Sequence, residues 1–380
     1  MQNRLRGFCI MRPHFVRAKG KACCRRLLME KTMQDSHILL SVRDLTKHYP
    51  AEGSGFFHRN NEFIHAVDHV SFDLREGETL GLVGESGCGK STTGRLVVGM
   101  EKPDGGSILY EGQELAGMSR KELSSIRTRL QMIFQDSYQS LNPRKRVLDI
   151  LADPMVFHGI VSRADASRRV GELLQLVGLP ADAADRYPHE FSGGQRQRIS
   201  IARALSLNPR LIVCDEPVSA LDVSIQAQIL NLMKDLQDRL GVAYLFIAHG
   251  LGAVHYISDR IAVMYLGEIV ELGEGQEVFR HPLHPYAQAL IGAVPAADPD
   301  RRPDDASILK GEAGDAVHVG EGCRFAARCP FVADQCPREH PVLTDFGNGH
   351  LAACWRAARG QEEIQTVTPM RHSHEYEPGT

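Results

Sequence analysis

The eight residues from Gly84 to Ser91 constrain this chain more than any other segment. They read Gly-Glu-Ser-Gly-Cys-Gly-Lys-Ser and fit the pattern G-x-x-x-x-G-K-[ST] at every fixed position. The apolar stretch 79–83 before them predicts a buried strand, and the stretch 92–98 after them predicts a helix. Glycines let successive backbone N–H groups turn toward phosphate oxygens, and the helix N-terminus adds partial positive charge. The segment therefore predicts a nucleoside triphosphate site, the alternative being a glycine-rich turn that binds nothing.

Each residue of this loop has an expected place around the triphosphate. Lys90 is expected to reach the β- and γ-phosphates, and the Ser91 hydroxyl to ligate Mg²⁺. The other residues expected to contact ATP or Mg²⁺ in this segment are Gly84, Glu85, Ser86, Gly87, Cys88, Gly89 and Thr92.

A second group of motifs lies about a hundred residues further on. Ser192 is placed to cap a predicted helix, and Gly193 and Gly194 leave backbone amides open to an anion. The apolar stretch 211–214 predicts a strand that ends in two carboxylates. Asp215 is expected to hold Mg²⁺, and Glu216 to polarise an attacking water molecule.

In this order, the motifs resemble those of the ATPase subunit of an ABC transporter, over roughly residues 37–356. The resemblance implies a Q-loop glutamine at Gln135, a switch histidine at His249 and a cross-dimer contact at Asp222. The expected catalytic residues are Glu216, His249, Gln135 and Lys90. Tyr49 is the candidate for stacking on adenine. Phe56 and Phe57 are its rivals, and core packing of Tyr49 is the alternative.

The resemblance also implies an α/β fold of the P-loop NTPase type. It would have a mostly parallel sheet, an antiparallel β subdomain, a helical subdomain at about 136–207 and a small C-terminal extension. Residues 37–42 read as an edge strand, and 147–156 and 163–177 as helices. The expected divisions are a basic, disordered leader at 1–36, a nucleotide-binding domain at 37–280, the extension at 281–356 and a polar tail at 357–380.

Partners are implied by the same resemblance. In this family the signature loop, here Ser192, Gly193, Gly194 and Gln195, acts on ATP bound to the opposite subunit of a head-to-tail dimer. The run His-Pro-Leu-His-Pro-Tyr at 281–286 resembles the extension of ATPases that serve importers of dipeptides, oligopeptides or nickel. The expected partners are a sister ATPase in a heterodimer, two membrane permease subunits and, indirectly, a solute-binding protein.

Charge and hydropathy argue against a nucleic-acid partner and against a membrane-spanning segment. A net charge of −3 over 380 residues gives no global field that would attract nucleic acid, so no nucleic-acid partner is expected. No apolar run approaches the ~18 residues that cross a bilayer. We expect a peripheral protein at the cytoplasmic face of the inner membrane, held there by its partners. A leader that contacts lipid headgroups or RNA stays open as an alternative.

Four of the nine cysteines fall close together near the C-terminus. They are Cys323, Cys329, Cys336 and Cys354, spaced C-x₅-C-x₆-C-x₁₇-C. Clustered thiols favour a metal, and four thiolates suit zinc or an iron–sulfur cluster equally. The wide spacing lacks the Cys-x₂-Cys knuckle of structural zinc, and related importers show a similar pattern with an iron–sulfur cluster. We expect [4Fe–4S], with zinc and four buried free thiols as alternatives.

The sequence departs from the family pattern at two positions, and two alternative functions remain open. Gly250 follows the switch histidine where relatives generally carry aspartate, and Ser137 stands where proline is usual. The rivals are a soluble ABC-type ATPase of translation or DNA repair, and the ATPase of an exporter. The single nucleotide unit, the lack of a long heptad run and the His-Pro-Tyr extension favour import.

Overall fold

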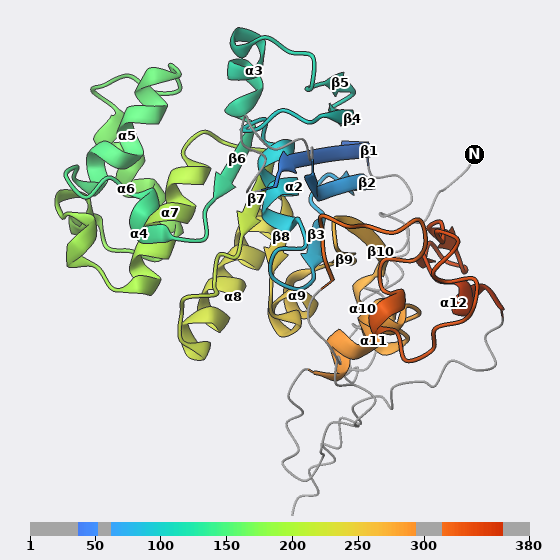
Figure 1. The fold of residues 1–380 in the computed structure, drawn as a ribbon. Helices are drawn as coiled ribbons and strands as arrows, with labels where there is room; N and C mark the ends of the chain where they lie inside the picture. Colours follow the sequence, from blue (N-terminus) through green and yellow to red (C-terminus); the bar gives the residue numbers. More distant parts are fainter. Residues whose placement is uncertain (1–36, 52–61, 294–313, 360–380) are drawn as a thin grey trace, which may run out of the picture. The chain divides into compact units, whose positions relative to one another are not determined.

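Two β-sheets organise the chain in the computed structural model, which describes residues 37–51, 62–293 and 314–359 (Figure 1). The expected leader, Phe56, Phe57 and the tail from residue 360 lie outside the described residues. No helix within these ranges is both long and apolar enough to span a bilayer.

The smaller sheet is antiparallel, with the strand order β2-β1-β4-β5. Its strands are β1 (Ile38–Pro50), β2 (Phe63–Arg75), β4 (Gly105–Tyr110) and β5 (Gln113–Glu114). The expectation of an edge strand at 37–42 is wrong, because β1 lies between β2 and β4. The covering strand β4 comes from beyond the glycine-rich loop, so nothing in the local pattern of β1 could indicate it.

The larger sheet has the order β11-β12-β10-β9-β3-β8-β7-β6. Its parallel part is β9 (Arg260–Tyr265), β3 (Thr79–Val83), β8 (Ala243–Ala248), β7 (Leu211–Asp215) and β6 (Leu130–Ile133). The antiparallel strands β10 (Glu268–Glu274), β12 (Leu351–Ala352) and β11 (Thr344–Asp345) continue it. The sheet is mixed and mostly parallel, as expected from the sequence. Strands of the C-terminal extension join it.

Alternation along the central strands separates two hydrophobic cores. In β7, Leu211 and Val213 pack into the core shared with the smaller sheet, whereas Ile212 and Cys214 pack into the core on the opposite face. A strand covered on both faces carries apolar residues at every position, which explains the continuous apolar run at 211–214.

The helices form three sets along the chain. The first set flanks the loop and the smaller sheet: α2 (Lys90–Val97) and α3 (Arg120–Arg127). The second is the helical group: α4 (Ser137–Ser140), α5 (Val147–Phe157), α6 (Ala166–Leu176), the short turns η1 (Ala181–Asp185) and η2 (Pro188–Glu190), and α7 (Gly193–Leu205). The third is α8 (Val223–Leu240), α9 (Leu251–Ile257), α10 (Gly275–Arg280), α11 (Pro285–Gly292), η4 (Ala326–Arg328) and α12 (Trp355–Arg359).

The helical group, α4 to α7, lies at the residues for which the sequence predicts it. Helices α5 and α6 confirm the expected helices at 147–156 and 163–177, the second beginning three residues later. Figure 1 shows α4 to α7 gathered together in green. Helix α7 contacts α4, α5, α6 and α8, so the group is built around it.

The extension is anchored on the main core by its first helix. Pro285 occupies the first turn of α11, and the side chain of His284 caps it by accepting the backbone N–H of Tyr286 at 3.0 Å. Tyr286 is fully buried in the core, and Leu290 packs against that core. The proline-led entry and the packing of Tyr286 and Leu290 are as the sequence predicts.

Candidate functional site

The glycine-rich loop connects a buried strand to a helix, as its sequence requires. All five residues of β3 are buried, and α2 begins at Lys90. Gly89 has φ 105°, and a Cβ there would lie 1.9 Å from the Ala66 carbonyl oxygen. Only glycine fits at this position, because any side chain would collide with backbone and strain φ.

Lys90 lies inside this loop. Its side chain is buried, and its ammonium group donates hydrogen bonds of 2.8 Å to the carbonyl oxygens of Gly84 and Glu85. Cys88 is also buried, and burial raises the pKa of its thiol, whereas Ser86 and Gly87 are exposed. The carbonyls hold the ammonium group without an opposing charge, so an anion that enters the loop can pair with it.

Ser91 and Asp215 meet at the end of the parallel sheet. The Ser91 hydroxyl donates to Asp215 Oδ1 at 2.7 Å, although 124 residues separate them. Burial raises the pKa of Asp215, and the Ser91 hydrogen bond opposes that rise. A hydroxyl and a carboxylate side by side form the oxygen donor set that Mg²⁺ prefers.

Gln135 and Glu216 form a second pair at the same edge. Gln135 Nε2 donates to Glu216 Oε2 at 2.9 Å, and the Glu216 backbone N–H donates to the Ile247 carbonyl at 2.9 Å. Glu216 has φ 47°, which is uncommon outside glycine and asparagine and often marks functional positions. The backbone of Glu216 is thereby tied to β8, and its carboxylate is held by Gln135, which follows β6.

These residues converge because of the strand order. Strands β3, β8, β7 and β6 are neighbours and parallel, so the loops after them share one edge. The loop after β3 holds Lys90, and Glu216 and Gln135 follow β7 and β6. His249 follows β8 and is exposed. Helix α9 then begins after Gly250 with no side-chain cap and no acidic residue in its first turn.

Tyr49 lies near the end of β1 and is tied to α2. Its hydroxyl donates to Glu101, and Glu101 pairs with Arg95 of α2 at 2.8 Å. Thr92 is buried one turn before Arg95, whose guanidinium donates to its hydroxyl at 3.4 Å. The ring of Tyr49 is partly buried, so it lies beside the helix that follows the phosphate loop.

The predicted signature residues begin α7. The Ser192 hydroxyl accepts the Gln195 N–H, and the Gln195 side chain accepts the Ser192 N–H at 3.0 Å. A Cβ on Gly194 would lie 2.5 Å from Ile225 of α8, so this glycine permits close packing of two helices. Asp222 is exposed just before α8. Helix α7 packs on the helical group and α8, whereas α2 packs on β2, β7 and β8. The structure thus places these motifs on different parts of one chain.

The four clustered cysteines line one cavity, together with His284, Phe325 and Trp355 among others. Burial raises the pKa of the Cys323 thiol to about 12, and it also raises the pKa values of Cys329 and Cys354. The structure therefore brings together the four thiols that the spacing singled out.

Their spacing bears on the metal they could hold. Tetrahedral zinc with Zn–S bonds of about 2.3 Å holds its sulfurs roughly 3.8 Å apart. Among the described residues, the group with ligand atoms all within 4.8 Å of one another is His48, His65 and Asp68, so no three of the cysteine sulfurs meet that limit. The sulfurs are thus spread more widely than compact tetrahedral coordination requires.

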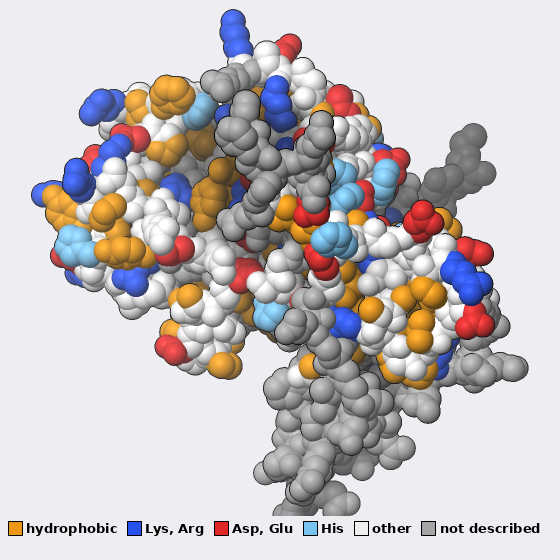
Figure 2. Space-filling model, in the orientation of Figure 1, with side chains coloured by type: hydrophobic (Ala, Val, Ile, Leu, Met, Phe, Trp, Pro, Cys, Tyr) orange, Lys and Arg blue, Asp and Glu red, His pale blue; other side chains and the backbone are white. Residues whose placement is uncertain are grey.

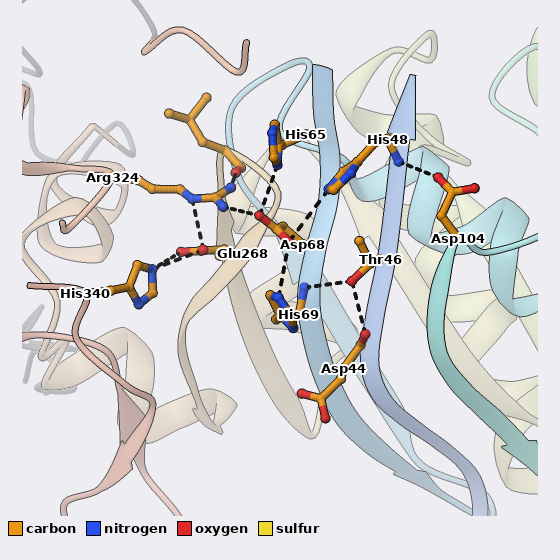
Figure 3. Close-up of polar contacts among 11 residues, drawn as sticks. Asp44, Thr46, His48, His65, Asp68, His69, Asp104, Glu268, Arg324 and His340 are labelled. Carbon is orange, nitrogen blue, oxygen red and sulfur yellow. Dashed lines mark hydrogen bonds and ion pairs between the residues drawn. The ribbon is translucent and has the colours of Figure 1, made fainter. Parts of the chain in front are cut away.

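No sequence pattern indicates the contacts that join the extension to the phosphate loop. Arg328 forms two hydrogen bonds with the Glu85 carboxylate, at 2.8 and 2.9 Å. The Tyr286 hydroxyl accepts the Glu85 backbone N–H at 2.8 Å. Arg324 pairs with Asp68 and Glu268 (Figure 3). Arg328 is 243 residues from Glu85, and no local pattern could relate them.

Comparison with protein families agrees with this geometry. Residues 67–219 match the model described as ABC transporter. Residues 270–336 match the model described as the oligopeptide/dipeptide transporter C-terminal region.

Individual relatives match over most of the chain. The chain is 47% identical to the oligopeptide transport ATP-binding protein AppF of Bacillus subtilis, over 85% of this chain and 98% of that protein. It is 48% identical to the oligopeptide transport ATP-binding protein OppF of Salmonella typhimurium, over 86% of this chain and 98% of that protein. Among solved structures, the ATP-binding cassette MJ0796, a dimer bound to ADP and Pi, matches with a TM-score of 0.55 and 28% identity. That match covers 62% of this chain and 98% of MJ0796. The chain therefore belongs to the ATPases of ABC transporters, in the group that carries the oligopeptide/dipeptide transporter C-terminal region.

Proposed function

We propose that this chain is the ATP-hydrolysing subunit that powers import of oligopeptides or a related small solute. The observation that carries the proposal is the near-complete alignment with AppF and OppF, which includes the C-terminal region as well as the nucleotide-binding part. Those relatives are named for oligopeptide transport, and the extension is the part that distinguishes this group from ABC ATPases in general.

In the proposed mechanism, the loop from Gly84 to Ser91 binds the triphosphate of ATP. Lys90 exchanges the carbonyls of Gly84 and Glu85 for phosphate oxygens, so that its buried charge attracts the β- and γ-phosphates. Ser91 and Asp215 would hold Mg²⁺, which supplies charge neutralisation at the phosphates when bound. Tyr49 is proposed to lie against adenine.

The water that attacks the γ-phosphate is proposed to lie at the pair of Gln135 and Glu216. Glu216 orients this water and acts as the general base that accepts its proton, while Gln135 holds the carboxylate in place. His249, at the end of the next strand, is proposed to contact the γ-phosphate. Positioning and electrostatic stabilisation account for most of the catalysis expected in phosphoryl transfer.

A second ATPase subunit completes each site in this proposal. The signature residues 192–195 lie on the helical group, which packs apart from α2 in the same chain. In a head-to-tail dimer they would close over ATP bound to the partner, and Asp222 would contact the partner across the interface. The match to MJ0796, solved as a dimer with ADP and Pi, supports this arrangement. We propose a sister ATPase as the partner.

Two membrane permease subunits, and a solute-binding protein beyond them, complete the proposed importer. The helical group is the proposed contact with the permeases at the cytoplasmic face of the membrane. Figure 2 shows hydrophobic side chains on the surface of this part of the molecule. Phe157, at the end of α5, is 83% exposed, and Tyr138 of α4 is 51% exposed. Such exposed apolar side chains favour a protein interface there.

We propose that Cys323, Cys329, Cys336 and Cys354 hold a [4Fe–4S] cluster. Four thiols around one cavity supply the right ligands, and their spacing in sequence, which lacks a Cys-x₂-Cys knuckle, favours a cluster over a single zinc ion. The cluster would cross-link a segment rich in short turns. Anaerobic purification followed by iron, sulfide and zinc analysis tests this directly. Protein that lacks all three, with four thiols open to alkylation in the native state, would refute the site.

The proposed divisions of the chain are those expected from sequence. They are a leader at 1–36, a nucleotide-binding domain at 37–280, an extension at 281–356 and a tail at 357–380. Limited proteolysis followed by mass spectrometry tests them, because cleavage is expected near the divisions rather than inside the sheets.

The experiment that tests the function is uptake of labelled oligopeptides by cells that carry or lack this gene. Loss of uptake on deletion, restored by the wild-type gene but not by a Glu216→Gln gene, is the expected result. Unchanged uptake of peptides and related solutes would contradict it.

A further inference from the structure

The segment between Cys323 and Cys329 contacts the nucleotide-binding part through two nearly buried arginines. The side chain of Arg324 is 7% exposed and that of Arg328 is 8% exposed. Arg328 belongs to η4, immediately before Cys329. Any rearrangement of this short segment must therefore displace both guanidinium groups.

Arg328 pairs with Glu85, which occupies the first x position of the G-x-x-x-x-G-K-[ST] loop. Its two terminal nitrogens donate to the two carboxylate oxygens of Glu85, at 2.8 and 2.9 Å. This forked geometry is the strongest and most directional pairing open to an arginine. Because Glu85 is five residues before Lys90, the contact restrains the loop that surrounds the lysine ammonium.

The backbone of Glu85 is held by the same region. The Tyr286 hydroxyl accepts the Glu85 N–H at 2.8 Å, and the Arg328 guanidinium also donates to the Tyr265 hydroxyl at 3.4 Å. The rings of Tyr265 and Tyr286 pack against Phe325, with centroids 5.3 and 5.5 Å away. Phe325 lies in the segment between Cys323 and Cys329, called the cysteine segment below. The carboxylate and the backbone N–H of Glu85 are therefore both held by groups that contact this segment.

Arg324 reaches the other end of the loop through the turn between β9 and β10. It donates to the Leu266 carbonyl and pairs with Asp68 and Glu268, and Glu268 also pairs with His340 of the extension (Figure 3). The neighbouring Gly267 donates its N–H to the Cys88 carbonyl at 3.0 Å. The cysteine segment thus supports the loop at Glu85 directly and at Cys88 through one turn.

The charge of Glu85 gives this support a consequence for nucleotide binding. A carboxylate in the loop would repel the triphosphate, and the Arg328 guanidinium neutralises it where little water can screen the pair. We propose that Arg328 is a positioning residue of the phosphate loop, through which the state of the four-cysteine site sets the affinity for ATP. The coupling of the four-cysteine site to ATP affinity rests on the metal proposed above at those cysteines. The positioning role of Arg328 does not.

The test measures binding of the fluorescent nucleotide mant-ATP with Mg²⁺ to the full-length protein. Arg328→Gln is expected to weaken binding about tenfold, within the usual range of coupling between sites. In a Glu85→Gln background the same substitution should change the affinity little, because its partner charge is gone. Arg338→Gln, which removes an exposed arginine from the same extension, is the matched control and should bind as wild type does.

Two results would overturn the role of Arg328. One is an Arg328→Gln protein that binds mant-ATP as tightly as Arg338→Gln. The other is an equal loss from Arg328→Gln with and without the Glu85 carboxylate, since that would indicate general damage to the fold. If Arg328→Gln folds poorly, the role of the Arg328–Glu85 pair can still be tested with the Glu85→Gln protein, by the metal-removal experiment below.

The second arm removes the metal by anaerobic chelation and repeats the titration. Metal removal should weaken mant-ATP binding in wild type by a similar factor and leave the Glu85→Gln protein unaffected. Protein that carries metal but binds mant-ATP equally after its removal would overturn the coupling. Protein that never carries iron or zinc would refute the proposed metal, while the Arg328→Gln comparison would still decide the role of Arg328.

Discussion

Among single residues, Glu216 and Gln135 carry the most specific proposal, because their hydrogen bond fixes a carboxylate where we propose that the attacking water lies. Glu216→Gln keeps the size and hydrogen bonding of the side chain but removes the charge that acts in the transition state. We expect ATP binding near the wild-type level and turnover reduced by about 10²- to 10⁴-fold. Phosphate-release assays and equilibrium nucleotide binding on the same preparation check this. Near-normal turnover would remove Glu216 from the mechanism.

Lys90 should behave differently, because its charge is proposed to act on bound ATP itself. Lys90→Ala removes a buried ammonium whose hydrogen bonds would pass to phosphate oxygens. We expect nucleotide affinity to fall by roughly ten- to a hundredfold, the usual worth of a charged hydrogen bond. Lys102→Ala, at an exposed lysine shortly after α2, is the control and should bind normally. Equal affinities for the two variants would exclude the proposed contact.

At the scale of elements, the start of α11 predicts how stability depends on pH. Burial lowers the pKa of His284 to about 3, and its neutral Nδ1 accepts the Tyr286 N–H. In the unfolded chain a histidine titrates near its ordinary pKa of about 6.5. Between these values the unfolded state binds more protons than the folded state. The free energy of unfolding should therefore fall as pH falls below about 6.5, by up to ~1.4 kcal/mol per pH unit.

The variant His284→Asn isolates this contribution. Asparagine can cap the helix through its side-chain oxygen but does not titrate. Denaturant unfolding at pH 7.5 and 5.5 should show a smaller loss of stability in the variant than in wild type. An equal loss in both proteins would mean that His284 does not set this pH dependence.

Elements with local signals were predictable from sequence, and elements that need distant partners were not. The strand, loop and helix around Lys90 follow one another without interruption over residues 79–97, and each has its own pattern. By contrast, the interior position of β1 depends on β4, and the pairing of β12 with β10 joins residues about 80 positions apart. The contacts of Arg328 and Arg324 are likewise set by tertiary packing. The four cysteines were found by spacing, but their shared cavity required the fold.

At the scale of the whole molecule, the separation of α2 and α7 predicts that one chain alone is a poor enzyme. If the signature residues act on the partner's ATP, turnover should rise with protein concentration and rise further with the proposed sister ATPase and the permeases. Measuring the specific ATPase rate across a dilution series, with and without these partners, checks this. A specific rate that stays constant on dilution and matches the assembled complex would indicate a complete site within one chain.

Transport by the assembled importer tests the proposed function most directly. The chain would be reconstituted in proteoliposomes with the proposed sister ATPase and a permease pair, with solute-binding protein and a labelled oligopeptide outside and ATP at the ATPase face. We predict ATP-dependent uptake with the wild-type chain and background uptake with Glu216→Gln, although both complexes bind ATP. Uptake that is equal for the two chains, or that proceeds without ATP, would contradict it.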